Sequence, residues 1–171
     1  MAEYHMHIQG IEAKDLGKEL SNTQYWYQGN VVGNLADKLI QESQHPFCTS
    51  TSSKLLLRTA NGLYVVQTNL ANAWNCCKNH KGNEKHPENF RGLSVETLVG
   101  DLNDLFKGHA YRIEVSKTLQ NEWLTQSRGD EGRGRAQLAS NLKKCHQNMS
   151  PVIDSLNELR HQYSRINGSN I

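Results

Sequence analysis

Hydrophobic residues recur at helical spacing in the first half of the chain. Between Asn30 and Glu42 the apolar side chains form one stripe along a helical wheel, which predicts an amphipathic helix. Between Leu70 and Cys77 a shorter stripe with the same spacing predicts a second helix, with Trp74 and Cys77 facing the core. We therefore expect packed amphipathic helices to supply much of the hydrophobic core.

The second half of the chain shows further helical patterns with clear ends. Ser94 is suited to cap the start of one helix, and Gly108 is suited to end it. Residues 117–126 and 138–149 have shorter apolar stripes, which predict two more helices. The Ser-Pro pair at 150–151 predicts the start of a separate last helix, because proline fits the first helical position, where its missing N–H is not needed.

Three segments have the pattern of β-strands. The clearest is the segment 54–68, in which two apolar runs flank Asn61-Gly62, a pair that tolerates the positive φ of a tight hairpin. Residues 110–116 alternate apolar and polar side chains, and residues 4–9 do so more weakly. Together with the helices, these segments predict an α+β fold, in which helices pack on a small antiparallel or mixed sheet containing the hairpin at about 54–68.

Length and composition favour a single domain. A chain of 171 residues has the usual size of one folding unit, so we expect one globular domain over residues 1–171. A polar run near 78–90 and a glycine-rich run at 128–135 predict flexible loops within it. The formal net charge of +2 is too small to indicate nucleic acid, and we expect no such partner.

The expected surroundings of the protein follow from its apolar runs and its cysteines. No run approaches the roughly 18 apolar residues that span a bilayer, so we expect a soluble protein with no membrane insertion and no signal peptide. The four cysteines match no disulfide framework, and we expect free thiols in a reducing cytoplasm. The abundance of Asn, Gln, Ser and Lys is similar to that of proteins from AT-rich bacteria, including effectors injected into host cells. That similarity implies an alternative localisation, a host cytosol reached without a cleaved signal.

Residues 76–86 contain several side chains of the kinds that bind zinc. Cys77 and His80 have a spacing that zinc sites use, and Cys76 and His86 could complete a tetrahedral set. No second pair of ligands follows at the usual distance, and Cys77 already belongs to the apolar stripe of a predicted helix. We therefore expect no cofactor and keep a zinc site at Cys76, Cys77, His80 and His86 as the alternative.

Cys48 and His45 are the candidates for nucleophilic catalysis. A catalytic thiolate needs a histidine nearby and usually a third, orienting group. Cys48 follows His45 closely in a predicted loop between a helix and a strand, a common place for active residues. This pair is the basis of an alternative function, a cysteine-dependent transferase or hydrolase centred on Cys48. A zinc-dependent hydrolase is the second enzymatic alternative.

Two groups of residues are candidates for binding. Tyr25, Trp26 and Tyr27 form an aromatic cluster in a polar stretch, and exposed aromatic rings contribute strongly to interfaces. Arg133 and Arg135 lie in the glycine-rich run and could contact phosphate, although the spacing of a nucleotide-binding loop is absent.

No catalytic motif of the chain is complete, whereas its apolar pattern is regular. We therefore interpret the protein as a small binding or regulatory module that acts through protein contacts. The compositional similarity to injected effectors would make that partner a host protein. Its identity and the oligomeric state lie beyond what the sequence indicates.

Overall fold

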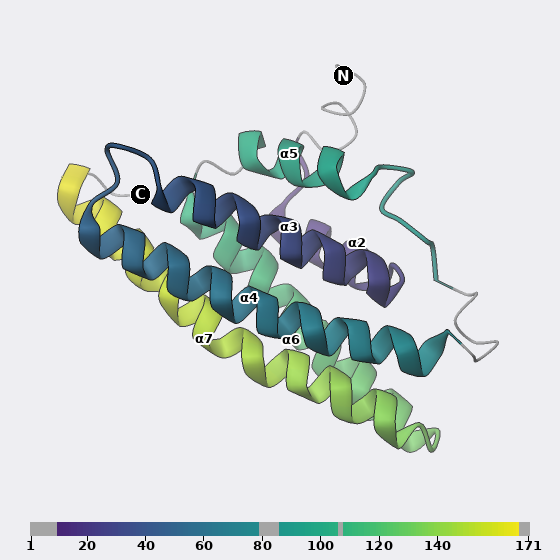
Figure 1. The fold of residues 1–171 in the computed structure, drawn as a ribbon. Coiled ribbons are helices and arrows are strands. Elements are labelled where there is room, and N and C mark those ends of the chain that lie inside the picture. The colour runs from purple at the N-terminus through teal and green to yellow at the C-terminus, as the bar shows by residue number, and fades with distance from the viewer. Residues whose placement is uncertain (1–9, 79–85, 106–107, 168–171) are drawn as a thin grey trace.

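The computed structural model describes residues 10–78, 86–105 and 108–167, except for the side chains of 101–105 and 163–167. Most of this part of the chain is helical (Figure 1). Over these ranges there are six helices and no β-sheet, and one isolated bridge joins Phe90 to Leu93. The helices are α2 (Ala13–Ser21), α3 (Tyr25–Ser43), α4 (Ser50–Cys77), α5 (Val95–Leu105), α6 (His109–Gly132) and α7 (Ala136–Asn167).

Four long helices form an antiparallel bundle. α3 packs on α4, α4 on α7 and α7 on α6, and each helix runs opposite to the neighbour on which it packs (Figure 1). α2 lies against α6, and α5 lies outside the bundle against α3. The start of α3, the end of α4 and the turn between α6 and α7 therefore meet at one end of the bundle, which is where the candidate site lies.

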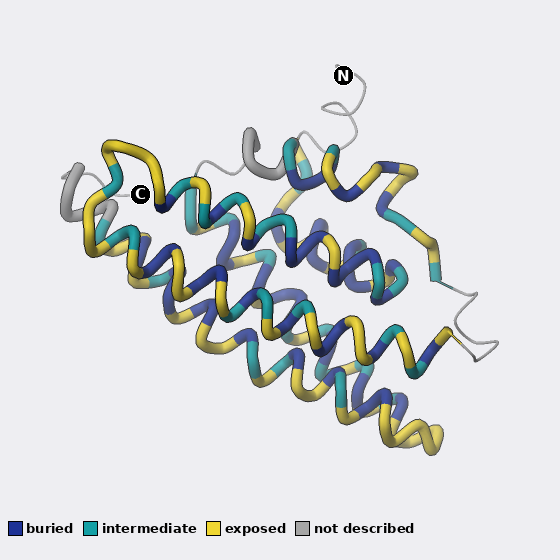
Figure 2. The backbone as a smooth tube through the Cα atoms, in the orientation of Figure 1, coloured by how far each residue is buried: buried dark blue, intermediate teal, exposed yellow. Residues whose placement is uncertain are grey.

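A single apolar cluster fills the interior of the bundle. Buried side chains line the inner side of each long helix, and the exposed positions lie on the outer sides (Figure 2). The largest fully buried side chains are those of Trp123, Tyr27 and Phe90. Burial of one apolar stripe per helix is what makes these amphipathic sequences helical, because packing supplies most of the stability of a helix.

The predicted α+β fold is wrong, and the hairpin at 54–68 is the main error. This segment lies in the middle of the 28-residue helix α4. The buried side chains of α4 recur every three or four residues straight through the expected turn; they are Leu55, Leu56, Thr59, Ala60, Leu63, Val66, Asn69, Leu70, Ala73 and Cys77. That period is helical, and it continues the stripe that was assigned to a separate helix from Leu70 onward.

Gly62 serves helix packing and not a turn. A Cβ atom at this position would lie 2.7 Å from Cγ2 of Val152 in α7, so the glycine allows α4 to approach α7 closely. Glycine inside a helix costs about 1 kcal/mol relative to alanine, and close packing of two long helices compensates for this cost. The packing of α4 on α7 therefore overrides the local preference of the Asn-Gly pair for a hairpin turn.

The strand predicted at 110–116 is also wrong, because these residues belong to α6. The alternation placed Arg112 on a polar side, but Arg112 is buried and 8% of its side chain is exposed. Its guanidinium donates two hydrogen bonds to the Glu42 carboxylate of α3, at 2.7 and 3.2 Å. A charged side chain can occupy an inward position of a helix when a partner neutralises it.

The last helix does not begin at Pro151, which lies in the interior of α7. Proline lacks the N–H that would bond to the carbonyl of Gln147, and Gln147 is on the exposed side of the helix. At the same level Gln120 of α6 donates to the carbonyl of His146 and to Oγ of Ser150, at 2.9 and 2.8 Å. These contacts hold α7 against α6 where its own hydrogen bonding is interrupted.

The other sequence-based expectations differ in outcome. The predicted helix at 30–42 is confirmed within α3, and Ser94 caps α5, since its Oγ accepts the N–H of Thr97 at 3.2 Å. The strand expected at 4–9 lies outside the described residues. Residues 128–132, which belong to the run expected as a flexible loop, form the last turn of α6. None of the described helices has the length and hydropathy of a membrane-spanning segment.

Replacing Asn61 with alanine distinguishes a continuous α4 from the hairpin. Asn61 is exposed within the helix, where alanine has the higher helix propensity, so we expect a gain of about 0.5 kcal/mol in the free energy of unfolding. Gly62→Val should lower it by about 1–3 kcal/mol, because the added side chain meets Val152. Urea unfolding followed by circular dichroism measures both changes, and a loss of stability in Asn61→Ala would contradict a helix at this position.

Candidate functional site

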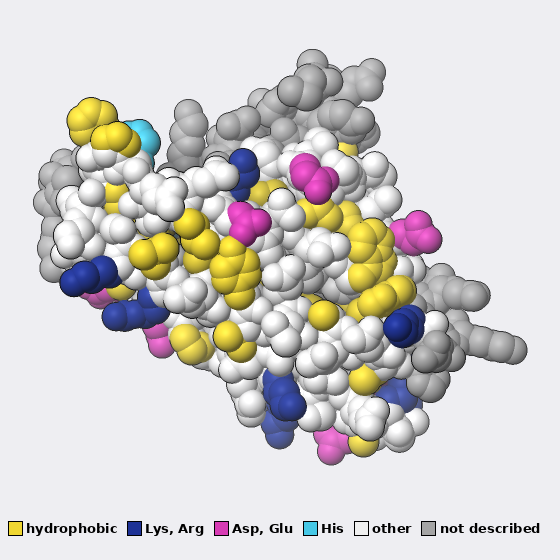
Figure 3. Space-filling view, in the orientation of Figure 1, with side chains coloured by type: hydrophobic (Ala, Val, Ile, Leu, Met, Phe, Trp, Pro, Cys, Tyr) yellow, Lys and Arg dark blue, Asp and Glu magenta, His cyan; other side chains and the backbone are white. Residues whose placement is uncertain are grey.

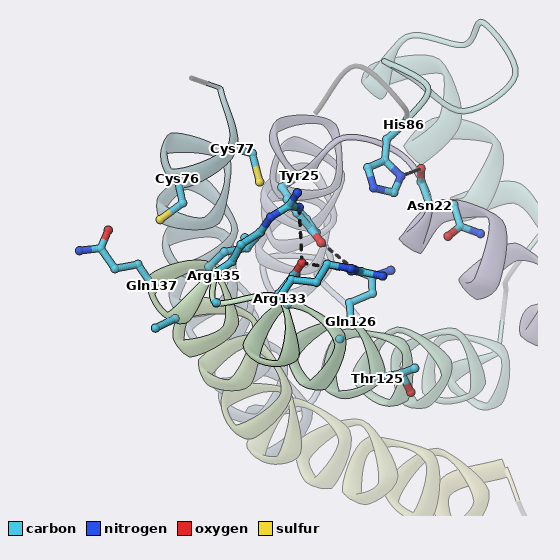
Figure 4. Close-up of a pocket in the computed structure, with 15 residues that line it drawn as sticks. Asn22, Tyr25, Cys76, Cys77, His86, Thr125, Gln126, Arg133, Arg135 and Gln137 are labelled. Carbon is cyan, nitrogen blue, oxygen red and sulfur yellow. Dashed lines mark hydrogen bonds and ion pairs between the residues drawn. The ribbon is translucent and has the colours of Figure 1, made fainter. Parts of the chain in front are cut away.

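A pocket of about 870 Å³, lined by both polar and apolar side chains, lies at the end of the bundle where α3, α4, α6 and α7 meet (Figure 4). A volume of this size is typical of sites for small organic ligands. Fifteen residues line it: Asn22, Tyr25, Cys76, Cys77, His86, Thr125, Gln126, Gly129, Asp130, Arg133, Gly134, Arg135, Ala136, Gln137 and Leu138.

A buried hydrogen-bond network positions the turn between α2 and α3 beside this pocket. Nε1 of Trp123 in α6 donates to Oε1 of Gln28 at 2.8 Å. Nε2 of Gln28 in turn donates to the carbonyls of Ser21 and Thr23, at 3.1 and 2.8 Å. These side chains are buried, so each hydrogen bond satisfies a group that would otherwise be costly to remove from water.

Gln126 of α6 extends this network to the wall of the pocket. Its Nε2 donates to the carbonyl of Ser21 at 3.0 Å, and its Oε1 accepts the hydroxyl of Tyr25 at 2.8 Å. Burial, together with the negative charge of Asp130, raises the pKa of Tyr25 far above its usual value. Tyr25 is therefore a neutral phenol and donates this hydrogen bond.

Asp130 lies in the wall of the pocket between two arginines. Nη1 of Arg133 and Nη1 of Arg135 lie 3.6 and 3.7 Å from its Oδ1. Burial raises the pKa of the Asp130 carboxyl, and the positive charges of the arginines oppose that change. The carbonyl of Asp130 also accepts the N–H groups of Arg133 and Arg135, at 3.1 and 2.9 Å, so the turn that carries both arginines closes on this one residue.

The structure brings three of the four predicted zinc ligands to the same pocket but not to one another. Cys77 and His86 stand apart across it, and Cys76 points away from both (Figure 4). The Cys76 thiol accepts Nδ2 of Asn141 at 3.5 Å, and burial raises the pKa of Cys77 to about 11. His80 lies outside the described residues. Within the ranges that the structure describes, no three His, Cys, Asp or Glu side chains are grouped closely enough to hold a metal ion.

Cys48 and His45 lie in the turn between α3 and α4, at the opposite end of the bundle from the pocket (Figure 1). The thiol of Cys48 donates to the carbonyl of Thr49 at 3.6 Å, while Nδ1 of His45 accepts the N–H of Phe47 at 3.2 Å. Partial burial and the nearby Glu42 carboxylate raise the pKa of Cys48. This change is opposite to the one that activates a cysteine nucleophile.

The aromatic cluster at the start of α3 divides between core and surface. Tyr25 and Tyr27 are buried, and the hydroxyl of Tyr27 donates to the carbonyl of Leu93 at 2.9 Å. Trp26 is half-buried on the outer side of α3, and its ring meets that of Tyr27 edge to face at 5.8 Å. Of the three predicted binding residues, Tyr25 lines the pocket and Trp26 lies at the surface.

Sequence reasoning missed several residues that complete the pocket. Asp130 lies in the same run as Arg133 and Arg135 and has the opposite charge, so the sequence alone indicates that it could pair with them. Gln126 and Asn22 gave no such signal, because the contact between Gln126 and Tyr25 joins positions about a hundred residues apart. Comparison of the chain with family models, curated proteins and solved structures finds no match.

Replacing Trp123 with phenylalanine tests the network that positions the α2–α3 turn. The change removes the donor to the buried Oε1 of Gln28 and some packing volume, so we expect the free energy of unfolding to fall by at least about 2 kcal/mol. Trp74→Phe is the matched control, because Trp74 is half-buried on the outer side of α4, and it should cost about 1 kcal/mol or less. Equal losses in the two variants would show that the network contributes little.

Thiol labelling tests whether Cys48 is an activated nucleophile. Because its pKa is raised, we expect iodoacetamide to alkylate Cys48 in the folded protein more slowly than it alkylates a free cysteine at pH 7. Cys77, with a pKa of about 11, should react more slowly still, and its rate should rise about tenfold per pH unit between pH 8 and 10. Mass spectrometry of the labelled peptides gives the rates, with the urea-unfolded chain as the reference. Labelling of Cys48 faster than free cysteine would revive the catalytic hypothesis.

Proposed function

We propose that this protein is a protein-binding module whose partner binds the outer surface of α3 and α4. The observation that carries the proposal is the absence of charge from this surface. We call it the α3–α4 face, and it consists of the exposed and half-buried side chains of Trp26, Asn30, Asn34, Asn61, Tyr64, Val65, Thr68, Ala71, Asn72, Trp74 and Asn75.

Two uncharged segments of the chain contain the residues of the α3–α4 face. Residues 20–36 and residues 59–77 contain no Lys, Arg, Asp, Glu or His, whereas charged residues make up 21% of the whole chain. A solvent-facing helix surface normally carries charged side chains, and depletion of charge is a compositional mark of protein interfaces. The outer sides of α3 and α4 therefore differ from an ordinary solvated surface.

The outer sides of the two helices adjoin and form one surface. The hydroxyl of Tyr64 in α4 donates to the Asp37 carboxylate of α3, which bridges the helices at one border of the face. Further along, Gly33 of α3 lies directly against the side chain of Gln67 in α4, since a Cβ atom at position 33 would clash with Nε2 of Gln67. The outer sides of the two helices therefore lie next to each other.

Apolar side chains lie among the uncharged polar ones on this surface. Val65 is 50% exposed, and Leu57, one turn beyond the face on α4, is 41% exposed. Figure 3 shows hydrophobic and uncharged polar side chains over most of this side of the molecule, with charged side chains at its rim and beside α3. Such a mixture resembles the core of an interface, where apolar and hydrogen-bonding groups are both removed from water.

The chemistry of the face indicates the chemistry of the partner. A charged side chain pressed against this surface would lose its water and find no opposite charge, which is costly. The partner should therefore present an uncharged surface of aliphatic and amide groups. Along α4 the face extends for about 20–25 Å, close to the width of a standard interface of about 800 Å² per partner.

Paired lysine substitutions test the α3–α4 face. Val65→Lys with Ala71→Lys places two charges on it, and Ser140→Lys with Gln147→Lys places two charges on exposed positions of α7 as the matched control. Neither pair should change the free energy of unfolding by more than about 1 kcal/mol. For a partner enriched with the unmodified protein, we expect the first pair to weaken binding at least tenfold and the control pair to leave the Kd unchanged.

Analytical ultracentrifugation of the same proteins shows whether a second copy is the partner. A concentration-dependent dimer that is lost in Val65→Lys with Ala71→Lys, but kept in the α7 control, would make the partner another molecule of this chain. Partners that bind the face variant and the control equally well, with no such dimer, would contradict the proposal.

A further inference from the structure

Two guanidinium groups share one carboxylate in the wall of the pocket at the end of the bundle. The side chain of Asp130 is 9% exposed, whereas those of Arg133 and Arg135 are 67% and 45% exposed. Figure 4 shows both arginines extending from the turn between α6 and α7 toward Tyr25 and Gln126. The pocket therefore has two positive charges at its mouth and one negative charge in its wall.

The ion pairs with Asp130 do not occupy all the N–H donors of the two arginines. Their N···O distances of 3.6 and 3.7 Å are longer than the roughly 2.7–3.2 Å of an N–H···O hydrogen bond. Each guanidinium carries five N–H donors in a planar fork, and one carboxylate at this range engages few of them. Donors of both arginines thus remain available to a ligand in the pocket.

The start of α7 adds further donors on the same side. Ala136, Gln137 and Leu138 form the first turn of this helix and line the pocket beside Arg135. The N–H groups of a first helical turn have no partner within the helix, and the helix dipole makes this end positive. Together with the arginines they favour an anion whose several oxygens can accept hydrogen bonds in different directions.

The size of the pocket and its apolar groups indicate more than an inorganic ion. A phosphate group fills only a small part of about 870 Å³. The ring of Tyr25, the thiol of Cys77 and the side chain of Leu138 add apolar groups to the lining of the pocket. A ligand that uses both the charged and the apolar groups has an anionic head and an organic body.

We propose that the pocket binds a small phosphate monoester, with its phosphate held by Arg133, Arg135 and the first turn of α7. A tetrahedral phosphate presents three terminal oxygens, which suits donors that converge from two side chains and a helix terminus better than a planar carboxylate does. The organic group of the ester lies along the wall formed by Tyr25, Cys77 and Leu138. This site is separate from the α3–α4 face.

Asp130 competes with the phosphate for the two arginines. Replacing it with asparagine keeps the shape of the side chain, removes the negative charge and frees both guanidinium groups. The proposed site therefore predicts that a substitution in its wall increases the affinity. Asp130→Asn should bind phosphate monoesters more tightly than the unmodified protein. A carboxylate that only stabilised the turn would give no such gain.

Isothermal titration calorimetry of the full chain with phenyl phosphate, at constant sodium chloride and pH, tests the proposal. We expect saturable binding of phenyl phosphate, weaker binding of inorganic phosphate and no binding of phenol. Arg133→Gln with Arg135→Gln should weaken phenyl phosphate binding at least tenfold. Arg128→Gln with Lys144→Gln is the charge-matched control, since both residues are exposed and neither lines the pocket. Asp130→Asn should tighten binding about tenfold.

Three results would overturn this site. The first is an absence of saturable phenyl phosphate binding to the unmodified protein and to Asp130→Asn, both shown to be folded by circular dichroism. The second is an equal loss of binding in Arg128→Gln with Lys144→Gln and in Arg133→Gln with Arg135→Gln, which would mean that only net charge matters. The third is equal affinity for phenyl phosphate and inorganic phosphate. None of these depends on the lysine variants of the α3–α4 face, so the two proposals fail separately.

Discussion

The hydrogen bond from Trp123 to Gln28 lies at the centre of this structure, and much else depends on it. It joins α6 to α3 within an apolar interior, and it orients the Gln28 amide so that its N–H groups hold the turn between α2 and α3. The same pair of helices is joined at one end by Arg112 with Glu42 and at the other by Tyr25 with Gln126. Apolar packing alone permits helices to slide or rotate, whereas buried polar pairs are satisfied in one register only. The polar contacts between α3 and α6 therefore fix the bundle geometry, and with it the position of the pocket.

The two proposed surfaces use the same helices in opposite ways. The α3–α4 face carries no charge, so its recognition rests on shape and on uncharged hydrogen-bonding groups. The pocket concentrates charge at the turn between α6 and α7, where Arg133 and Arg135 lie over Asp130. Tyr25 begins α3 and Cys77 ends α4, so both helices of the face also reach the pocket. A ligand in the pocket and a protein on the face would thus contact one rigid pair of helices.

The sequence predicts most of the helices from their apolar stripes. The wrong predictions are those that rest on only a few neighbouring residues. The stripe at 30–42 spans more than three turns and led to the correct element. The hairpin at 54–68 rested on Asn61-Gly62, whose local preference is overridden because Gly62 packs against Val152, far away in the sequence. Pro151 was expected to start a helix for the same kind of local reason. At the pocket, the arginines were identifiable from their own run of residues. Gln126 and Asn22 were not, because only the fold brings them there.

The order of the long helices has a consequence for how the chain folds. α3 with α4, and α6 with α7, are two antiparallel helical hairpins, and each is closed by a short turn. Contacts within a hairpin are local, so closing them costs little chain entropy and is fast. The packing of α4 on α7 joins the two hairpins, and its contacts, such as that of Gly62 with Val152, link residues about ninety positions apart, so it should form after the hairpins. Gly62 therefore belongs to the step in which the two hairpins dock.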